Sequence, residues 1–230
     1  MKTETTRTIY RKDYRPPVFE VDAVEMGFDL DPSATTVATR LHLVRSIPGP
    51  LTLDGEALEL LFISVDGRRL AAGQYALMEA GEKQTLTIAQ LPDSCTLDIA
   101  VRLAPGTNSS LMGLYISHGN FFTQCEAEGF RKITFFPDRP DVMARFTVML
   151  RADKQRYPVL LSNGNLIDSG TLPDAANPFL DLEFKTVRYE LEIELGGSDR
   201  YRYAEDTQLL LKGRSEVFHH RDSNTLKRIR

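Results

Sequence analysis

The chemically most suggestive residues of this sequence lie in one short run, TQCEAE at positions 123–128. An amide, Gln124, and two carboxylates, the first of them Glu126, fall within five positions of this run. Phenylalanines flank it, at 121–122 on one side and at 130 on the other. Carboxylates beside an aromatic wall are suited to holding an ammonium group through charge-assisted hydrogen bonds, or to meeting the surface of another domain. Gln124 and Glu126 are therefore the candidate binding residues.

Other polar clusters have structural explanations. His219 and His220 are adjacent, and adjacent residues of a strand point to opposite faces, so their rings would chelate a metal ion poorly. The segment 137–141, PDRPD, is interpreted as a rigid, proline-braced corner held by an arginine–carboxylate pair rather than as an acid–base cluster. We also expect a local salt bridge between Glu128 and Arg131. None of these groups predicts catalysis or metal binding.

Composition limits the classes of protein and partner. Of the 230 residues, 42% are hydrophobic and 26% are charged, which is typical of a soluble globular protein. The net charge of −4 gives no reason to expect nucleic acid or an anionic membrane as a partner. No apolar run approaches the ~20 residues of a membrane span, and the N-terminus lacks the apolar core of a signal peptide. Cys95 and Cys125 are expected to be free thiols in a reducing, cytoplasmic setting, with Cys125 acting as a small buried hydrophobe.

The elements that must position these residues are strands, because apolar residues recur with a period of two along most of the chain. Expected strands cover 19–31, 35–44, 51–53, 58–65, 68–70, 75–78, 84–88, 95–103 and 142–150, with tail strands at 182–185, 189–195, 208–212 and 216–218. Asp54-Gly55 and Asp66-Gly67 are expected turns, and Asn163-Gly164 predicts a hairpin between 159–161 and 166–167. The sequence therefore predicts an all-β, mainly antiparallel sandwich with very little helix.

Several ordered motifs between Tyr10 and Leu172 resemble one known family. They are Leu53-Asp54-Gly55-Glu56, Leu111-Met112-Gly113-Leu114-Tyr115, the run from Gln124 to Phe130, the run from Asp138 to Thr147, and Leu160-Leu161-Ser162-Asn163-Gly164-Asn165. The chain resembles the N-terminal β domain of the aminopeptidase N family of zinc metallopeptidases, in its bacterial and plastid alanyl-aminopeptidase branch. This implies a single saddle-like β domain over 1–230, in which 1–174 match closely and 175–230 are a diverged continuation.

The resemblance also implies roles for the candidate residues. In the family, the glutamate of the Q-x-E segment, here Glu126, pairs with the free α-ammonium of a peptide substrate. The glutamine, here Gln124, lines the pocket for the first side chain. The peptide bond after the glutamate, here Glu126-Ala127, tends to be cis, and the sequence leaves its isomer in this chain open. The implied ligand is therefore a peptide N-terminus.

The family's zinc belongs to a separate catalytic domain, which carries H-E-x-x-H and G-A-M-E-N motifs. Neither motif occurs in these 230 residues. We therefore expect a domain that binds no cofactor, is inactive alone, and docks on a catalytic domain or another protein partner. Two alternatives stay open: a stand-alone β-sheet module that binds peptides or proteins, and an engineered or truncated scaffold with no activity.

Overall fold

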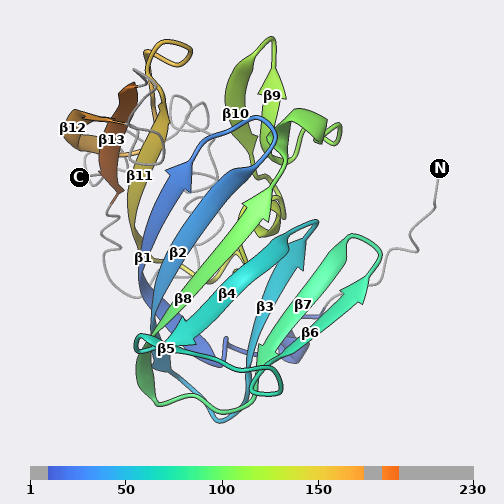
Figure 1. Ribbon diagram of the computed structural model, residues 1–230. Coiled ribbons are helices and arrows are strands. Elements are labelled where there is room, and N and C mark those ends of the chain that lie inside the picture. Colours follow the sequence, from blue (N-terminus) through green and yellow to red (C-terminus); the bar gives the residue numbers. More distant parts are fainter. Residues whose placement is uncertain (1–9, 174–182, 192–230) are drawn as a thin grey trace.

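The computed structural model describes residues 10–173 and 183–191, and in these it consists of strands joined by loops and short 3₁₀ turns (Figure 1). The strands are β1 (Phe19–Asp29), β2 (Thr35–Arg45), β3 (Leu51–Glu56), β4 (Glu59–Val65), β5 (Arg68–Arg69), β6 (Ala76–Ala80), β7 (Lys83–Ile88), β8 (Ser94–Leu103), β9 (Gly113–Ser117), β10 (Asn120–Gln124), β11 (Arg145–Asp153), β12 (Asn165–Pro173) and β13 (Glu183–Leu191). The 3₁₀ turns are η1 (Arg11–Asp13), η2 (Pro105–Thr107) and η3 (Phe130–Lys132). The prediction of an all-β fold with very little helix is confirmed.

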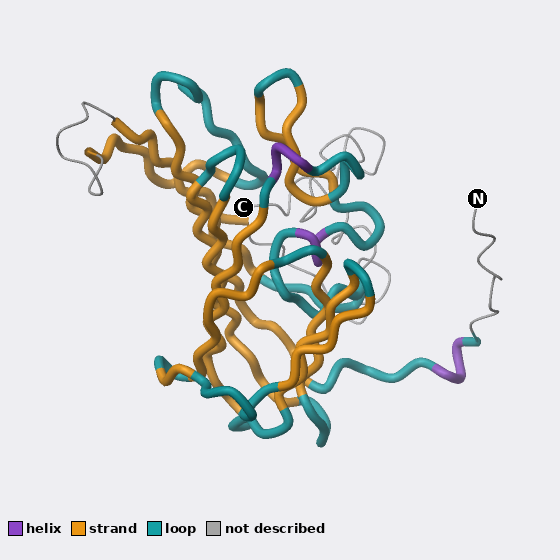
Figure 2. The backbone as a smooth tube through the Cα atoms, turned by 45° about the vertical axis from the view of Figure 1, so that its right-hand side comes forward, coloured by secondary structure: helices purple, strands orange, loops and turns teal. Residues whose placement is uncertain are grey.

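Two sheets enclose the core. The larger has eight strands in the order β12-β13-β11-β1-β2-β8-β4-β5, and the smaller has three in the order β3-β7-β6. A single hydrophobic cluster joins them, with Val24, Leu41 and Leu97 from the large sheet and Leu53 and Leu86 from the small one, each fully buried. Figure 2 shows the two layers nearly edge-on, with the hairpin of β9 and β10 beyond one end of the small sheet.

Alternating side chains decide which face of the large sheet is buried. Along β1 and β2 the apolar positions turn inward, while the intervening charged side chains turn outward. Three ion pairs, Arg145 with Asp22, Arg40 with Asp98 and Arg102 with Glu59, and a hydrogen bond between His42 and Glu25 link neighbouring strands across this outer face, at 2.6–3.1 Å. Such exposed pairs each contribute little stability, but they give the sheet one wet face and one apolar face.

Most strand pairs are antiparallel, as predicted, but β1 and β11 pair in parallel, with Val24 opposite Phe146. This pairing lets β11, which follows the hairpin and the 137–141 corner, return to the centre of the large sheet. It also brings Phe146 into the core beside residues more than one hundred positions earlier in the chain. The strand predicted at 142–150 begins later than expected, at Arg145.

Two predicted turns are wrong. Asp54-Gly55 is not a turn, because both residues belong to β3 and pair with Thr85 and Gln84 of β7. The chain leaves β3 instead at Ala57, whose φ is +54°. The expected hairpin around Asn163-Gly164 does not form either. Residues 157–164 are a loop, and Asn165 begins β12, which pairs with β13. Pro158 has no N–H to donate to a strand partner, which disfavours a strand at 159–161.

The tail differs from the prediction in part. The two expected strands at 182–185 and 189–195 are represented by one continuous strand, β13, which lies between β11 and β12. Residues 192–195, the predicted strands at 208–212 and 216–218, and the pair His219 and His220 lie outside the described residues.

Candidate functional site

The candidate residues lie where β10 ends. Thr123 and Gln124 are the last residues of that strand and pair with Leu114 and Gly113 of β9. The chain then leaves the sheet through Cys125, which is 2% exposed, and Glu126. Gln124 and Glu126 are both half-buried. The structure therefore keeps the two predicted binding residues adjacent, at the base of a hairpin.

A tight turn follows Glu126. The Glu126-Ala127 peptide bond is cis, as the resemblance implies for the family. The Gly129 N–H donates to the Cys125 carbonyl at 2.9 Å and closes the turn. A Cβ on Gly129 would lie 2.8 Å from both Cys125 Cα and Gln124 O, so the backbone approaches itself too closely for any other residue at position 129. The conformation around Glu126 is thus fixed by close packing.

The turn stands on a platform made by β3. A Cβ on Gly55 would lie 2.3 Å from the ring of Phe135, because this fully buried ring packs directly on the strand backbone. Asp54 and Phe136 exchange backbone hydrogen bonds at 2.8 and 3.1 Å. Lys132 Nζ also reaches Glu56 Oε1 at 2.7 Å. The platform was missed at the sequence level because Asp-Gly was interpreted as a turn.

One guanidinium joins the turn to the platform. Arg131 Nε donates to Asp138 Oδ2 at 3.0 Å, and Nη2 donates to the Asp138 carbonyl at 3.2 Å. Nη1 lies 3.4 Å from Glu128 Oε2, which confirms the predicted Glu128–Arg131 pair, and Nη2 lies 4.0 Å from Asp54 Oδ2. The Asp138 side chain is fully buried and Arg131 is 16% exposed. Burial raises the pKa of the Asp54 carboxyl above its usual value, although nearby Arg131 acts in the opposite direction.

The 137–141 corner is held as predicted by an arginine–carboxylate pair. Arg139 binds Asp141 through two hydrogen bonds of 2.8 and 2.7 Å. Tyr14 donates to the same carboxylate at 2.9 Å, and Arg139 donates to the Arg15 carbonyl at 2.7 Å, so the corner also fixes the N-terminal segment. Burial tends to raise the pKa of Asp141, but the bonds from Arg139 and Tyr14 outweigh it and hold that pKa below its usual value.

The expected aromatic wall is divided between core and surface. Phe130 is 5% exposed and packs edge-on against Phe136 and Phe146, with ring centroids 4.9 and 6.0 Å apart. Phe122 is 47% exposed and stacks on Tyr115. The interpretation of these rings as one wall beside the carboxylates is therefore wrong, because the alternation of β10 and the turn at Gly129 send them in different directions.

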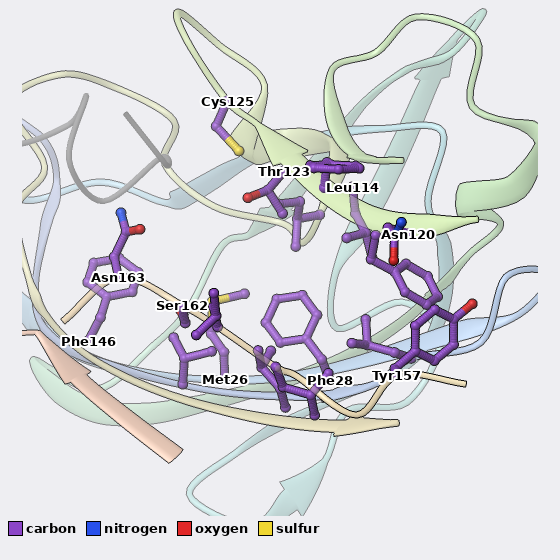
Figure 3. Close-up of a pocket in the computed structure, with 18 of the residues that line it drawn as sticks. Met26, Phe28, Leu114, Asn120, Thr123, Cys125, Phe146, Tyr157, Ser162 and Asn163 are labelled. Atoms are coloured by element: carbon purple, nitrogen blue, oxygen red, sulfur yellow. The ribbon is translucent and has the colours of Figure 1, made fainter. Parts of the chain in front are cut away.

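An apolar pocket of about 270 Å³ lies beside the site (Figure 3). Its floor is the inner face of β1 and β11, including Met26, Phe28 and Phe146, and its walls are the β9–β10 hairpin and the loop 157–163. Thr123 and Cys125 line this pocket, whereas Gln124 and Glu126 do not. The two candidate residues thus alternate along the chain with two residues of the pocket lining.

Two features of the pocket resemble an interface more than a finished core. Tyr157 is 6% exposed, and its hydroxyl has no hydrogen-bond partner among the residues that the structure describes. At the rim, Val159 and Leu161 expose 67% and 77% of their surface, next to the exposed Phe122. Exposed apolar side chains gathered around a pocket are typical of surfaces that another protein covers.

In the part of the chain that the structure describes, no three histidine, cysteine, aspartate or glutamate side chains gather so that they could hold a metal ion. The donor sets of these residues therefore do not fit the family's zinc. Within the same residues, no helix has the length and apolar character needed to cross a membrane. Cys95 and Cys125 are both buried, and they do not form a disulfide, as expected.

Comparison with known proteins defines the class. The family model described as the peptidase M1 N-terminal domain matches residues 48–186, and the chain belongs to this family. Among solved structures, Legionella pneumophila aminopeptidase A in complex with aspartic acid superposes with a TM-score of 0.67 at 30% identity, over 78% of this chain and 20% of that one. An M1 zinc metallopeptidase from Deinococcus radiodurans shares the fold, with a TM-score of 0.58 at 14% identity, over 77% of this chain and 40% of that one.

Curated relatives specify the branch. The chain is 48% identical over 175 residues to the aminopeptidase N of Caulobacter vibrioides and 41% identical over 172 residues to that of Escherichia coli. These matches cover 75% and 74% of this chain but only 20% and 19% of the relatives. The chain therefore spans about a fifth of the length of the relatives it matches, and it corresponds to their N-terminal domain.

Proposed function

We propose that this chain is the substrate-recognition and docking domain of an aminopeptidase N-like zinc metallopeptidase. The observation that carries the proposal is the 48% identity to an aminopeptidase N across three quarters of the chain, in a family of N-terminal M1 domains. In this role the chain is not catalytic alone. Zinc and the hydrolytic groups belong to a catalytic domain, on which a bound zinc ion would activate water.

Recognition of the substrate is assigned to Glu126 and Gln124. A peptide with a free N-terminus carries one α-ammonium group, and a half-buried carboxylate binds such a cation through charge-assisted hydrogen bonds. Glu126 would accept these bonds, while Gln124, two residues earlier, would contact the first side chain. Support comes from the tightly packed turn, since Gly129 and the hydrogen bond to Cys125 hold Glu126 in one backbone conformation. A site that is already ordered loses less entropy on binding.

Docking is assigned to the pocket and its rim. The catalytic domain would place apolar side chains against Val159 and Leu161 and a polar group near the Tyr157 hydroxyl. This assignment is supported by the exposure of the rim and by the buried hydroxyl without a partner. It also places the interface beside Gln124 and Glu126, because Thr123 and Cys125 line the same pocket. The cytoplasmic location expected from the cysteines stays a prediction.

The test is a chimera in which the matching region of the Caulobacter vibrioides aminopeptidase N is replaced by that of this chain. Glu126→Ala should weaken kcat/KM for substrates with a free α-amine by about 2–4 kcal/mol, roughly 30- to 700-fold, from loss of a largely desolvated charge pair. N-blocked peptides should be nearly indifferent to the change. Glu59→Ala, which removes an exposed carboxylate on β4, is the matched control.

Two results would count against the proposal. An inactive chimera that still binds zinc would mean that this domain does not complete the site. Equal losses for free and blocked substrates would remove Glu126 from amine recognition. The alternative of a stand-alone binding module is favoured only by the pocket, and it predicts instead that the chain fails to associate with the catalytic portion while its pocket still binds an apolar peptide.

A further inference from the structure

We infer that Arg131 is a positioning residue that holds the turn carrying Glu126 against the β3 platform. Arg131 contacts three segments at once: Glu128 in the turn, Asp138 in the corner, and Asp54 in β3. Its own backbone N–H lies 3.3 Å from Asp138 Oδ2, so backbone and side chain are held by the same carboxylate. The inference rests on the proposed role of Glu126 in binding the substrate amine.

Geometry makes Arg131 suited to this role. A guanidinium presents several N–H donors in a fixed plane, so it can serve separate acceptors without changing its conformation. Lysine at this position would keep the charge but could not make the same set of bonds. Lys132, the next residue, contacts Glu56 instead, and Asp54 and Glu56 stand two positions apart on β3. The η3 turn is therefore attached to one strand by two cations.

Burial makes the attachment hard to release. The Asp138 side chain is fully buried, and its backbone N–H lies 3.3 Å from Asp54 Oδ2. Removing the guanidinium would break the ion pair between Arg131 and the fully buried Asp138 side chain, and loss of one partner of a buried pair is strongly destabilising. The segment would then have to shift so that the carboxylate gains water, and η3 would shift with it.

A shift of η3 would also move Glu126, because the segment that links them is short. Glu126 lies five residues before Arg131, and the intervening turn is closed by the Gly129 N–H bond to Cys125. The same turn carries Glu128, which Arg131 contacts directly. Gly129 also packs against Gln124 O and Cys125 Cα, so a displaced η3 would displace both candidate residues. A purely structural role would lower stability without changing how the amine is recognised.

The experiment has two readouts. In the full 230-residue chain, amide hydrogen exchange is followed at Gly129 and, as an internal reference, at core amides of β2 and β8. Arg131→Gln should accelerate exchange at Gly129 at least ten-fold relative to the reference amides, and Arg131→Lys should give a smaller acceleration. The matched control is Arg145→Gln, which breaks the exposed ion pair with Asp22 on the outer face and should leave Gly129 unchanged.

In the chimera with the Caulobacter vibrioides catalytic portion, Arg131→Gln should raise KM for free-amine substrates at least ten-fold. The kcat and the zinc content should change little, and Arg131→Lys should restore part of the loss. Unchanged exchange at Gly129 would overturn the positioning role. So would faster exchange with unchanged KM, provided that Glu126→Ala still weakens amine binding. If Glu126→Ala itself has no effect, the proposed function fails, and the exchange data alone decide whether Arg131 holds the turn.

Discussion

Gly55→Ala is expected to destabilise the domain, although alanine is normally the better residue in a strand. The added Cβ would lie 2.3, 2.6 and 3.0 Å from three atoms of the Phe135 ring, well inside van der Waals contact. Phe135 is fully buried, so the ring cannot swing into solvent. Replacing glycine in a strand gains about 0.5–1 kcal/mol, whereas overpacking a core costs about 1–3 kcal/mol. Because the 2.3 Å approach puts the overpacking cost in the upper part of that range, at about 2–3 kcal/mol, the net loss should be about 1–2.5 kcal/mol.

The assay is urea unfolding followed by circular dichroism, since the chain has no tryptophan. Gly27→Ala is the matched control, because Gly27 also lies in a strand but its Cβ would meet only Met149 Cε, at 3.6 Å. That variant should be neutral or stabilised by up to about 1 kcal/mol. In a Phe135→Leu background the cost of Gly55→Ala should largely disappear. Equal effects at Gly55 and Gly27, or no rescue by Phe135→Leu, would refute the platform described here.

Two further outcomes follow from single side chains. Folding lowers the pKa of Asp141, so the contribution of its carboxylate to stability is complete above the ordinary value of 3.8 and is lost as pH falls through the native pKa. The urea midpoints of Asp141→Asn and of the parent should therefore differ at pH 6 and converge toward pH 2. A constant gap between the two midpoints would contradict this. Tyr157→Phe removes a buried hydroxyl that has no partner in the described part of the chain, so thermal or urea unfolding of the full chain should show no loss and up to about 1 kcal/mol of gain. A loss above 1 kcal/mol would mean that the hydroxyl is already satisfied.

The strands could be predicted from sequence because one face of each is buried. Alternation in 35–44 and 95–103 corresponds to β2 and β8, whose alternate residues are buried in the core. The same reasoning failed at Asp54-Gly55, where the glycine leaves room for the Phe135 ring and does not form a turn. Local sequence cannot distinguish these uses, because Phe135 is eighty positions away in the chain. The parallel pairing of β1 with β11 could not be predicted either, because it joins segments more than one hundred positions apart in the chain.

The candidate site was predicted only in part. Gln124 and Glu126 are candidates through their residue types and the resemblance; the structure places them where β10 ends, and their binding roles stay predictions. The ion pair between Arg131 and Asp138 was not predicted, because its strength depends on the burial of the Asp138 side chain. A fully buried carboxylate needs a cation, but sequence does not show that Asp138 is buried and Asp141 is partly exposed. The paired acidic and basic residues of DGE and RK, at 54–56 and 131–132, were the available signal.

The two faces of the large sheet differ in what it would cost to cover them. On the outer face, carboxylates and guanidiniums are paired across strands, and a partner docking there would have to strip water from both members of each pair. At the pocket, Val159 and Leu161 already expose apolar surface, and covering it releases water at a gain. A partner that selects the less costly face therefore approaches from the side of the pocket. Because Thr123 and Cys125 line that pocket, the docking proposed above would bring the partner close to Gln124 and Glu126, which alternate with these two residues in the chain.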